Sequence, residues 1–69
     1  MLRRNTLKIG EVVDMTPLGE SLAAVRGLLR SLGEVRDVFN PGRRNEQVYA
    51  RREMGGSEWW PTKAWKRRE

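Results

Sequence analysis

Arginine is the residue type that gives this chain its chemical character. The 69 residues include 14 Lys and Arg against 9 Asp and Glu, a formal net charge of +5. A guanidinium group presents a planar fork of donors that matches phosphate, and a basic balance favours a polyanionic partner. Two pairs are notable for their spacing: Arg26 and Arg30 are four residues apart, and Arg43 and Arg44 lie in a turn-rich stretch. These residues suit phosphate binding, with nucleic acid as the first candidate, and the alternative is that they are ordinary solvated arginines of a soluble surface.

The residue types used most in catalysis and metal binding are missing. The chain contains neither Cys nor His, which excludes a disulfide, a thiolate metal site and the commonest general base. Its nine carboxylates form no motif with a nucleophile and show no metal-ligand spacing. We therefore expect no enzymatic activity, no metal and no cofactor.

Length and hydropathy set further bounds. A chain of this length makes one domain and buries only about 60% of its unfolded surface, so its core is marginal. No apolar run approaches the roughly 18 residues of a membrane span, and no apolar core follows Arg3 and Arg4 as it would in a signal peptide. We expect no membrane association and a cytoplasmic location.

A helix from Pro17 to Leu32 is the clearest predicted element. Thr16 can cap its start, Pro17 suits its first position, and Gly33 can end it. Its apolar residues recur at spacings of four, three, four and three: Leu18, Leu22, Val25, Leu29 and Leu32. Residues at this spacing share one face, which we expect to be buried against a core.

The opposite face of this helix combines small residues with arginine: Gly19, Ala23, Arg26, Gly27 and Arg30. Small residues let a helix approach a surface closely while long cationic side chains reach outward. A DNA major groove, about 12 Å wide, is one such surface. The alternative is that the small residues pack against another helix and the arginines are solvated.

The segments on either side of this helix are less regular. Over residues 6–15, the spacing of Ile9, Val12 and Val13 favours a short helix, with a strand as the alternative. Residues 34–39 and 47–51 are predicted strands joined by a turn-rich loop at residues 40–45.

This order of elements resembles the winged helix-turn-helix superfamily of bacterial and phage regulators, over about residues 6–52. The resemblance implies a small α+β fold: two main helices and a β-hairpin wing, with a DNA-binding domain at residues 1–54. It also implies base contacts from the second helix, through Glu20, Ser21, Ala23, Arg26, Gly27 and Arg30. The wing contacts would come from Arg43, Arg44 and Asn45.

The function that follows from this resemblance is sequence-specific binding of double-stranded DNA. Transcriptional regulation or architectural DNA binding in a phage or bacterium, including excisionase-like factors, is the expected setting. One small module buries little surface, so a homodimer or a cooperative array on DNA is expected.

The C-terminal tail, residues 55–69, contains all three tryptophans and a basic end: Trp59, Trp60, Trp65, Lys66 and Arg67. Two interpretations stay open. The tail packs back to complete the core, or it forms an arm that binds a host protein, as in a small inhibitor or adaptor. Single-stranded nucleic acid or RNA would use the same tryptophans for base stacking.

Overall fold

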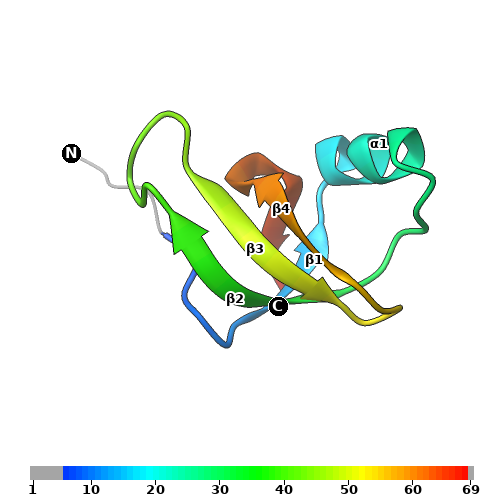
Figure 1. Cartoon of the computed structure of the whole chain (residues 1–69), viewed down its shortest axis with the longest axis horizontal. Helices are drawn as coiled ribbons and strands as arrows, with labels where there is room; N and C mark the ends of the chain where they lie inside the picture. The colour runs from blue at the N-terminus through cyan, green and yellow to red at the C-terminus, as the bar shows by residue number, and fades with distance from the viewer. Residues whose placement is uncertain (1–5, 69) are drawn as a thin grey trace.

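The computed structural model describes residues 6–68 and contains one antiparallel sheet and one α-helix. The elements follow in the order β1 (Val12–Met15), α1 (Pro17–Val25), β2 (Gly33–Phe39), β3 (Gln47–Arg52), β4 (Ser57–Pro61), the 3-10 helix η1 (Thr62–Ala64) and β5 (Trp65–Arg67). In the sheet the strands lie in the order β4-β3-β2-β1-β5 (Figure 1).

The predicted winged helix-turn-helix, with two main helices and a hairpin wing, is wrong. Residues 12–15 form the strand β1 instead of a helix, because Val13 and Met15 alternate with outward side chains and are both buried. The strands β2 and β3 do form close to the predicted ranges. They lie inside the sheet, however, paired on their outer sides with β1 and β4, so they are not a wing.

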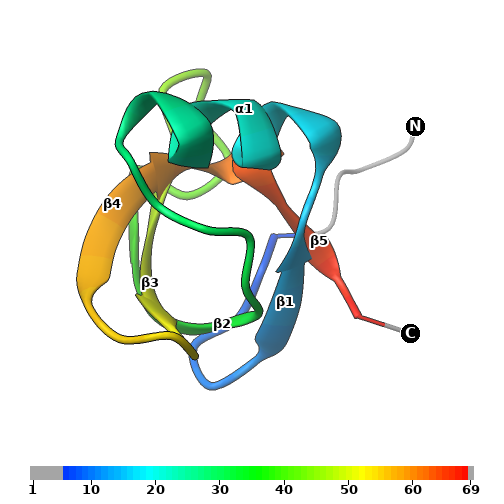
Figure 2. The same ribbon diagram turned by 90° about the vertical axis from the view of Figure 1, so that its right-hand side faces the viewer.

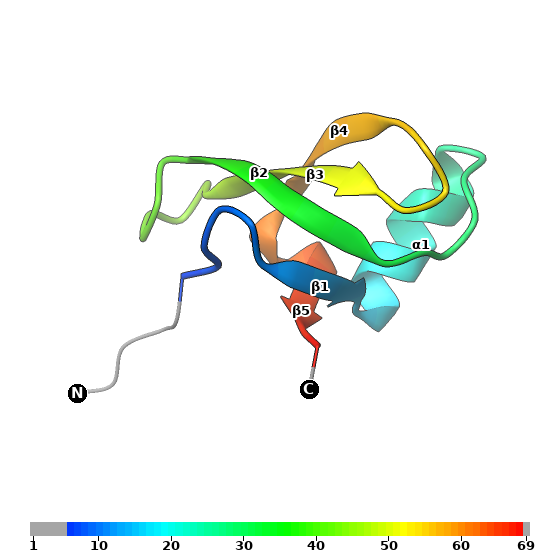
Figure 3. The ribbon, with the colours of Figure 1, turned by 90° about the horizontal axis from the view of Figure 1, so that it is seen from below.

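The sheet curls around one hydrophobic core. Figure 2 shows the strands arranged around the core, with α1 lying across the top of the view. β1 pairs with β5, so that Val13 lies opposite Arg67 and Met15 opposite Trp65 (Figure 3). The largest fully buried side chains are Trp60, Met15, Val13, Val35 and Val48.

The helix begins where the sequence predicts and ends seven residues earlier. The Thr16 side chain accepts a hydrogen bond from the Gly19 N–H, and Pro17 occupies the first turn, which confirms the predicted start. The last helical residue is Val25. Gly27 follows in the left-handed region (φ 74°), and the N–H of Leu28 donates to the Ala23 carbonyl.

This ending is a Schellman motif, in which a left-handed glycine satisfies the last helical carbonyls. The prediction that the helix continues to Leu32 and stops at Gly33 is therefore wrong. Gly27, assigned to the helix interior, is the residue that terminates the helix. Gly33 instead begins β2 and lies against the Trp65 ring.

The buried face of α1 is not the one predicted, although Leu22 does pack against the core. Gly19 and Ala23 are its buried residues, whereas Leu18 and Val25 are 44% and 84% exposed. The cause is a close backbone contact between α1 and η1. A Cβ on Gly19 would overlap the carbonyl oxygen of Ala64 and lie 3.0 Å from its carbonyl carbon, so only glycine fits.

Two more hydrogen bonds fix this contact. The Thr16 N–H donates to the Ala64 carbonyl (2.9 Å), and the Thr16 hydroxyl donates to the Lys63 carbonyl (2.6 Å). The start of α1 is thereby tied to the segment between β4 and β5.

The tail contributes two strands to the sheet. Trp60 and Trp65 are buried and meet edge to face, with ring centroids 5.5 Å apart. Trp59 points to the other face of β4 and is 40% exposed. Gly55 and Gly56, both with positive φ, lie between β3 and β4.

We predict that Gly19→Ala destabilises the protein, because the added methyl group overlaps the backbone of Ala64. The free energy of unfolding should fall by about 1–3 kcal/mol, as in overpacked cores. Urea denaturation followed by tryptophan fluorescence measures it. Ser21→Ala, on the exposed side of α1, is the control and should change stability by less than about 0.5 kcal/mol. If Gly19 faced solvent, alanine would instead stabilise the helix by roughly 1 kcal/mol.

Candidate nucleic-acid interface

Arg26 is held against the core at the end of α1. Its guanidinium carbon lies 4.3 Å from the centroid of the Trp60 ring, and its Nη1 donates to the Trp59 carbonyl (3.2 Å). A cation over a tryptophan face contributes about 0.5–1 kcal/mol at an exposed site. Arg26 therefore links α1 to β4, and a groove contact would require this link to break.

Arg30 is similarly engaged. Its Nε donates to Glu20 (2.6 Å), and its Nη2 lies 3.1 Å from both carboxylate oxygens of Asp14. Two carboxylates thus balance its charge and tie the segment after α1 to both α1 and β1. The other residues expected to contact DNA from this helix differ in burial: Ala23 is buried, whereas Ser21 and Gly27 are exposed.

Arg43 and Arg44 lie in the loop between β2 and β3, and both are exposed. Neither has an ion-pair partner within residues 6–68. The loop is braced from within: the buried Glu46 carboxylate accepts from the Gly42 N–H (3.2 Å), and Asn40 donates to the side-chain oxygen of Asn45 (3.0 Å). We call residues 40–46 the arginine loop.

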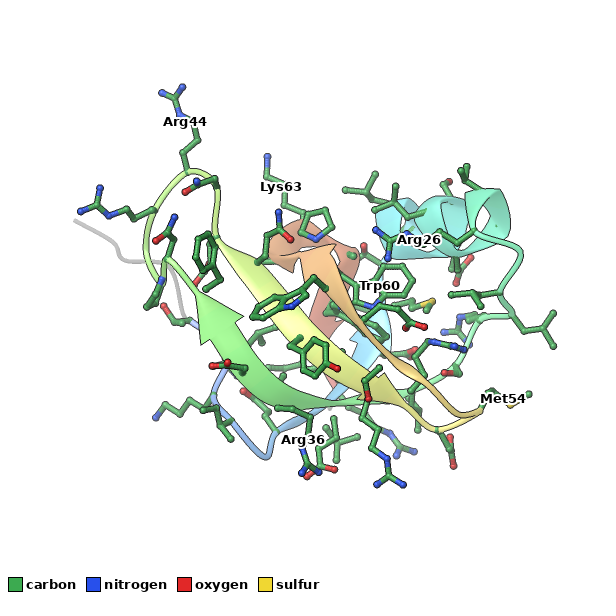
Figure 4. All side chains as sticks on the ribbon, in the orientation of Figure 1. Arg26, Arg36, Arg44, Met54, Trp60 and Lys63 are labelled. Carbon is green, nitrogen blue, oxygen red and sulfur yellow. The ribbon has the colours of Figure 1, made fainter. Side chains whose placement is uncertain are left out.

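The structure does not bring the two arginine pairs together. The arginine loop and α1 lie at opposite ends of the molecule, whose longest dimension is 37 Å (Figures 1 and 3). In Figure 4, Arg44 extends from one end while Arg26 lies beside α1 near the other. A single surface combining Arg26 and Arg30 with the loop arginines is therefore absent from the described part of the chain.

A different neighbour lies beside the arginine loop. Phe39, Tyr49 and Trp59 form a cluster on the outer face of β2, β3 and β4, which we call the aromatic face. The Trp59 ring lies 5.1 Å from Tyr49 and 6.2 Å from Phe39, centroid to centroid. Phe39 is 52% exposed, Trp59 is 40% exposed, and Tyr49 is half-buried.

Strand register creates this cluster. Tyr49 pairs with Trp59 on one side and with Asp37 on the other, and Phe39 is the last residue before the arginine loop. The aromatic face could not be predicted from the sequence, because Tyr49 and Trp59 each have a neighbour in the chain that is also apolar. Only the alternation of buried Val48, Ala50 and Trp60 shows which neighbour faces outward.

Charged residues border the aromatic face. Arg51 follows Tyr49 by two residues in β3, so it lies on the same face of the strand, and it is exposed. Arg36 in β2 forms an ion pair with Glu34 (3.4 Å). In Figure 4, Lys63 and Arg44 extend on the same side of the molecule, and Arg36 extends on the other. Asp37 is the acidic residue directly opposite Tyr49, and its carboxylate also accepts from the Val38 N–H.

The basic residues of the tail differ in their contacts. Arg67 pairs with Glu11 and donates to the Thr6 carbonyl (2.9 Å), so its charge is used within the protein. Lys66 is exposed on β5. Of the three tail tryptophans, Trp59 is the one available at the surface.

Comparisons with protein-family models, curated proteins and solved structures gave no match for this chain. Within residues 6–68, no helix has the length and apolar character needed to cross a membrane.

We predict that Arg26 stabilises the fold and that Arg44 does not. Arg26→Ala removes a cation–π contact and a hydrogen bond, and should lower the free energy of unfolding by about 1–2 kcal/mol. Arg44→Ala should change it by less than about 0.5 kcal/mol. Thermal and urea denaturation of both variants make the comparison. Equal losses in the two variants would contradict the assignment of Arg26 to the core.

Proposed function

We propose that this protein binds single-stranded nucleic acid across the aromatic face, with the arginine loop holding the phosphate backbone. The observation that carries the proposal is the cluster of Phe39, Tyr49 and Trp59 on the strands next to the arginine loop, whose Arg43 and Arg44 are exposed and have no ion-pair partner within residues 6–68. Unpaired bases offer flat rings for stacking, and their backbone offers phosphates within reach of the same protein surface.

The aromatic face suits stacking because its rings are supported. Each ring belongs to a different strand of one sheet, and Trp59 contacts both of the others. Supported rings lose little conformational freedom when a base stacks on them. Stacking of this kind contributes about 1–3 kcal/mol per base and tolerates any base, since every base has a π-face.

The arginine loop supplies the electrostatic part. Five ion pairs engage Arg30, Arg36, Arg52 and Arg67 with carboxylates, whereas Arg43 and Arg44 have no such partner within residues 6–68. Their charges are therefore available to a ligand. Asp37, opposite Tyr49, disfavours phosphate at that point and can accept a hydrogen bond from a base amino group.

Double-stranded DNA, the ligand expected from the sequence, is the competing form. The helix α1 was expected to enter the DNA major groove. Its Ala23 is buried, however, and Arg26 and Arg30 contact other residues of the protein. Stacking on the aromatic face also requires bases that are not already paired. These observations favour the single strand and make duplex binding an outcome of the test.

A protein partner is the second candidate. Tryptophan and arginine dominate binding hot spots, and Trp59 is the exposed tryptophan of the tail. Binding to a polyanion depends steeply on salt, so salt dependence separates the two candidates.

A nucleic-acid ligand also agrees with the cytoplasmic location predicted from the sequence.

We predict that Trp59→Ala weakens binding to single-stranded oligonucleotides. Loss of one stacked base costs about 1–3 kcal/mol, which raises Kd roughly 5- to 150-fold. Fluorescence anisotropy with labelled oligothymidine and oligouridine measures Kd, while the emission of buried Trp60 and Trp65 reports folding. Ile9→Ala, an exposed apolar residue outside the sheet, is the control and should bind normally. A duplex bound as tightly as the single strand would contradict the proposed ligand.

We predict that changing Arg43 and Arg44 to Gln reduces the salt dependence of binding. Each lost phosphate contact makes the negative slope of log K against log salt shallower by about 0.7 for a single strand. The slope of the double variant should therefore be shallower than that of the wild type by about 1.4. Titrations at several salt concentrations give the slope. Arg44→Gln alone should change the slope by about 0.7. Lys66→Gln, which removes one charge on β5, is the charge-matched control for that single variant and should change it less. Binding by the wild-type protein that is independent of salt, or absent at low salt, would overturn the proposal.

A further inference from the structure

A bulge in β2 decides which side chains of that strand lie on the aromatic face. The pairing between β2 and β3 shifts between Val35 and Asp37, so Arg36 is an additional residue of β2 at this point. Val35 lies opposite Ala50, and Asp37 lies opposite Tyr49. The alternation of buried and outward side chains therefore changes at the bulge.

This change brings two side chains to the outside of the sheet. Val35 is buried, and strict alternation would turn Asp37 and Phe39 inward with it. Beyond the bulge Val38 packs against the core instead, while Asp37 and Phe39 are exposed. One additional residue thus places a carboxylate and an aromatic ring together on the aromatic face. Bulges next to active sites re-aim side chains in the same way.

Asp37 lies next to two of the three rings. Across the strands it is opposite Tyr49, and the Cβ atoms of such a pair are about 4.5–5.5 Å apart. Along β2 it precedes Phe39 by two residues on the same face. A base that stacks on Tyr49 would have one edge beside the Asp37 carboxylate.

The Asp37 carboxylate is oriented but not neutralised. Its Oδ1 accepts a hydrogen bond from the Val38 N–H (2.9 Å), which orients the group. Within residues 6–68, Oδ2 has no hydrogen-bond partner and the carboxylate forms no ion pair. The neighbouring Arg36 pairs with Glu34 and extends away from Arg44 (Figure 4). An acceptor oxygen is therefore available to a ligand on the aromatic face.

An ionised carboxylate can only accept hydrogen bonds, so it distinguishes between bases. Cytosine and adenine carry an exocyclic amino group, whereas thymine and uracil carry a carbonyl oxygen at the corresponding position. The amino group gains a charge-assisted hydrogen bond beside Asp37. The carbonyl oxygen meets a second acceptor and is repelled. Stacking alone tolerates any base, so Asp37 adds a difference between bases that the rings do not make.

From this geometry we infer that the aromatic face prefers single strands whose bases carry an exocyclic amino group, cytosine and adenine, over thymine and uracil. Asp37 is the residue that determines this preference. The inference rests on the proposed function and adds base selectivity to it. The negative charge of Asp37 also repels phosphate, so a base rather than the backbone is expected beside Tyr49.

Fluorescence anisotropy with labelled oligocytidine and oligothymidine of equal length tests the inference. Both bases are pyrimidines with rings of the same size, so their stacking areas are similar. The wild-type protein should bind oligocytidine at least about fivefold more tightly at neutral pH, as expected for one hydrogen bond to a charged group. Oligothymidine should still bind through stacking.

Asp37→Asn should abolish or reverse this preference. The new side chain has the same size and keeps an oxygen for the Val38 N–H, but its amino group can donate to the thymine oxygen. Loss of a negative charge strengthens binding to every strand, so the ratio of the two dissociation constants is the readout. Glu53→Gln removes the same charge from an exposed position after β3 and should leave the ratio unchanged.

Equal affinity of the wild-type protein for the two strands would contradict the inference and leave the proposed function intact. A preference that persists in Asp37→Asn would also contradict it, since the difference would then come from stacking. Equal loss of the preference in Glu53→Gln would show a long-range charge effect in place of a contact. Absence of binding to either strand at low salt would overturn the proposed function, and the inference with it.

Discussion

The backbone contact between α1 and η1 is the constraint on which most of this structure depends. Gly19 lets the helix reach the carbonyl of Ala64, and Thr16 bonds to the backbone of the same turn. Since η1 joins β4 to β5, this contact also positions the two edge strands of the sheet. It determines which side of α1 is buried, and so it leaves Leu18 and Val25 outside. A residue with no side chain thus decides where several large side chains lie.

Within residues 6–68, two groups of arginines have different physical roles. Arg26 covers a buried tryptophan, and Arg30 and Arg67 tie separate segments together through carboxylates. Arg52 pairs with Glu58 across the turn between β3 and β4. Arg43 and Arg44 contribute nothing comparable to the fold. A count of basic residues treats both groups alike, so it overstates the number of arginines that a ligand can meet. A core this small gains cohesion from side chains that combine a long apolar stem with a charged end.

Local signals in the sequence predicted the local features correctly. The Thr16 cap, Pro17 and the two strands flanking the arginine loop all depend on residues close together in the chain. The end of α1 was also available locally, because Ala23, Gly27 and Leu28 form a recognisable Schellman sequence. The leucines that continue at helical spacing to Leu32 concealed it. They gave a stronger periodic signal than one glycine.

The remaining features depend on contacts between distant residues. The burial of Gly19 is decided by Ala64, and the outward direction of Trp59 is decided by its pairing with Tyr49. Strand β1 forms because β2 and β5 lie on either side of it, although four residues of mixed pattern are weak evidence for a strand. The aromatic face consequently had no signature in the sequence alone. Phe39, Tyr49 and Trp59 are each typical of a strand, and only the pairing register of β2, β3 and β4 shows that they lie on one face.

The pairing of β1 with β5 has a consequence for how this protein is made. Val13 and Met15 find their partners at Arg67 and Trp65, near the other end of the chain. Pairing across so long a separation has to close a large loop before it gains any contact, which slows folding. During synthesis on the ribosome, β1 is made before β5. One edge of β1 therefore stays unpaired until β5 has been synthesised. The native sheet can therefore be completed only after translation has passed Arg67.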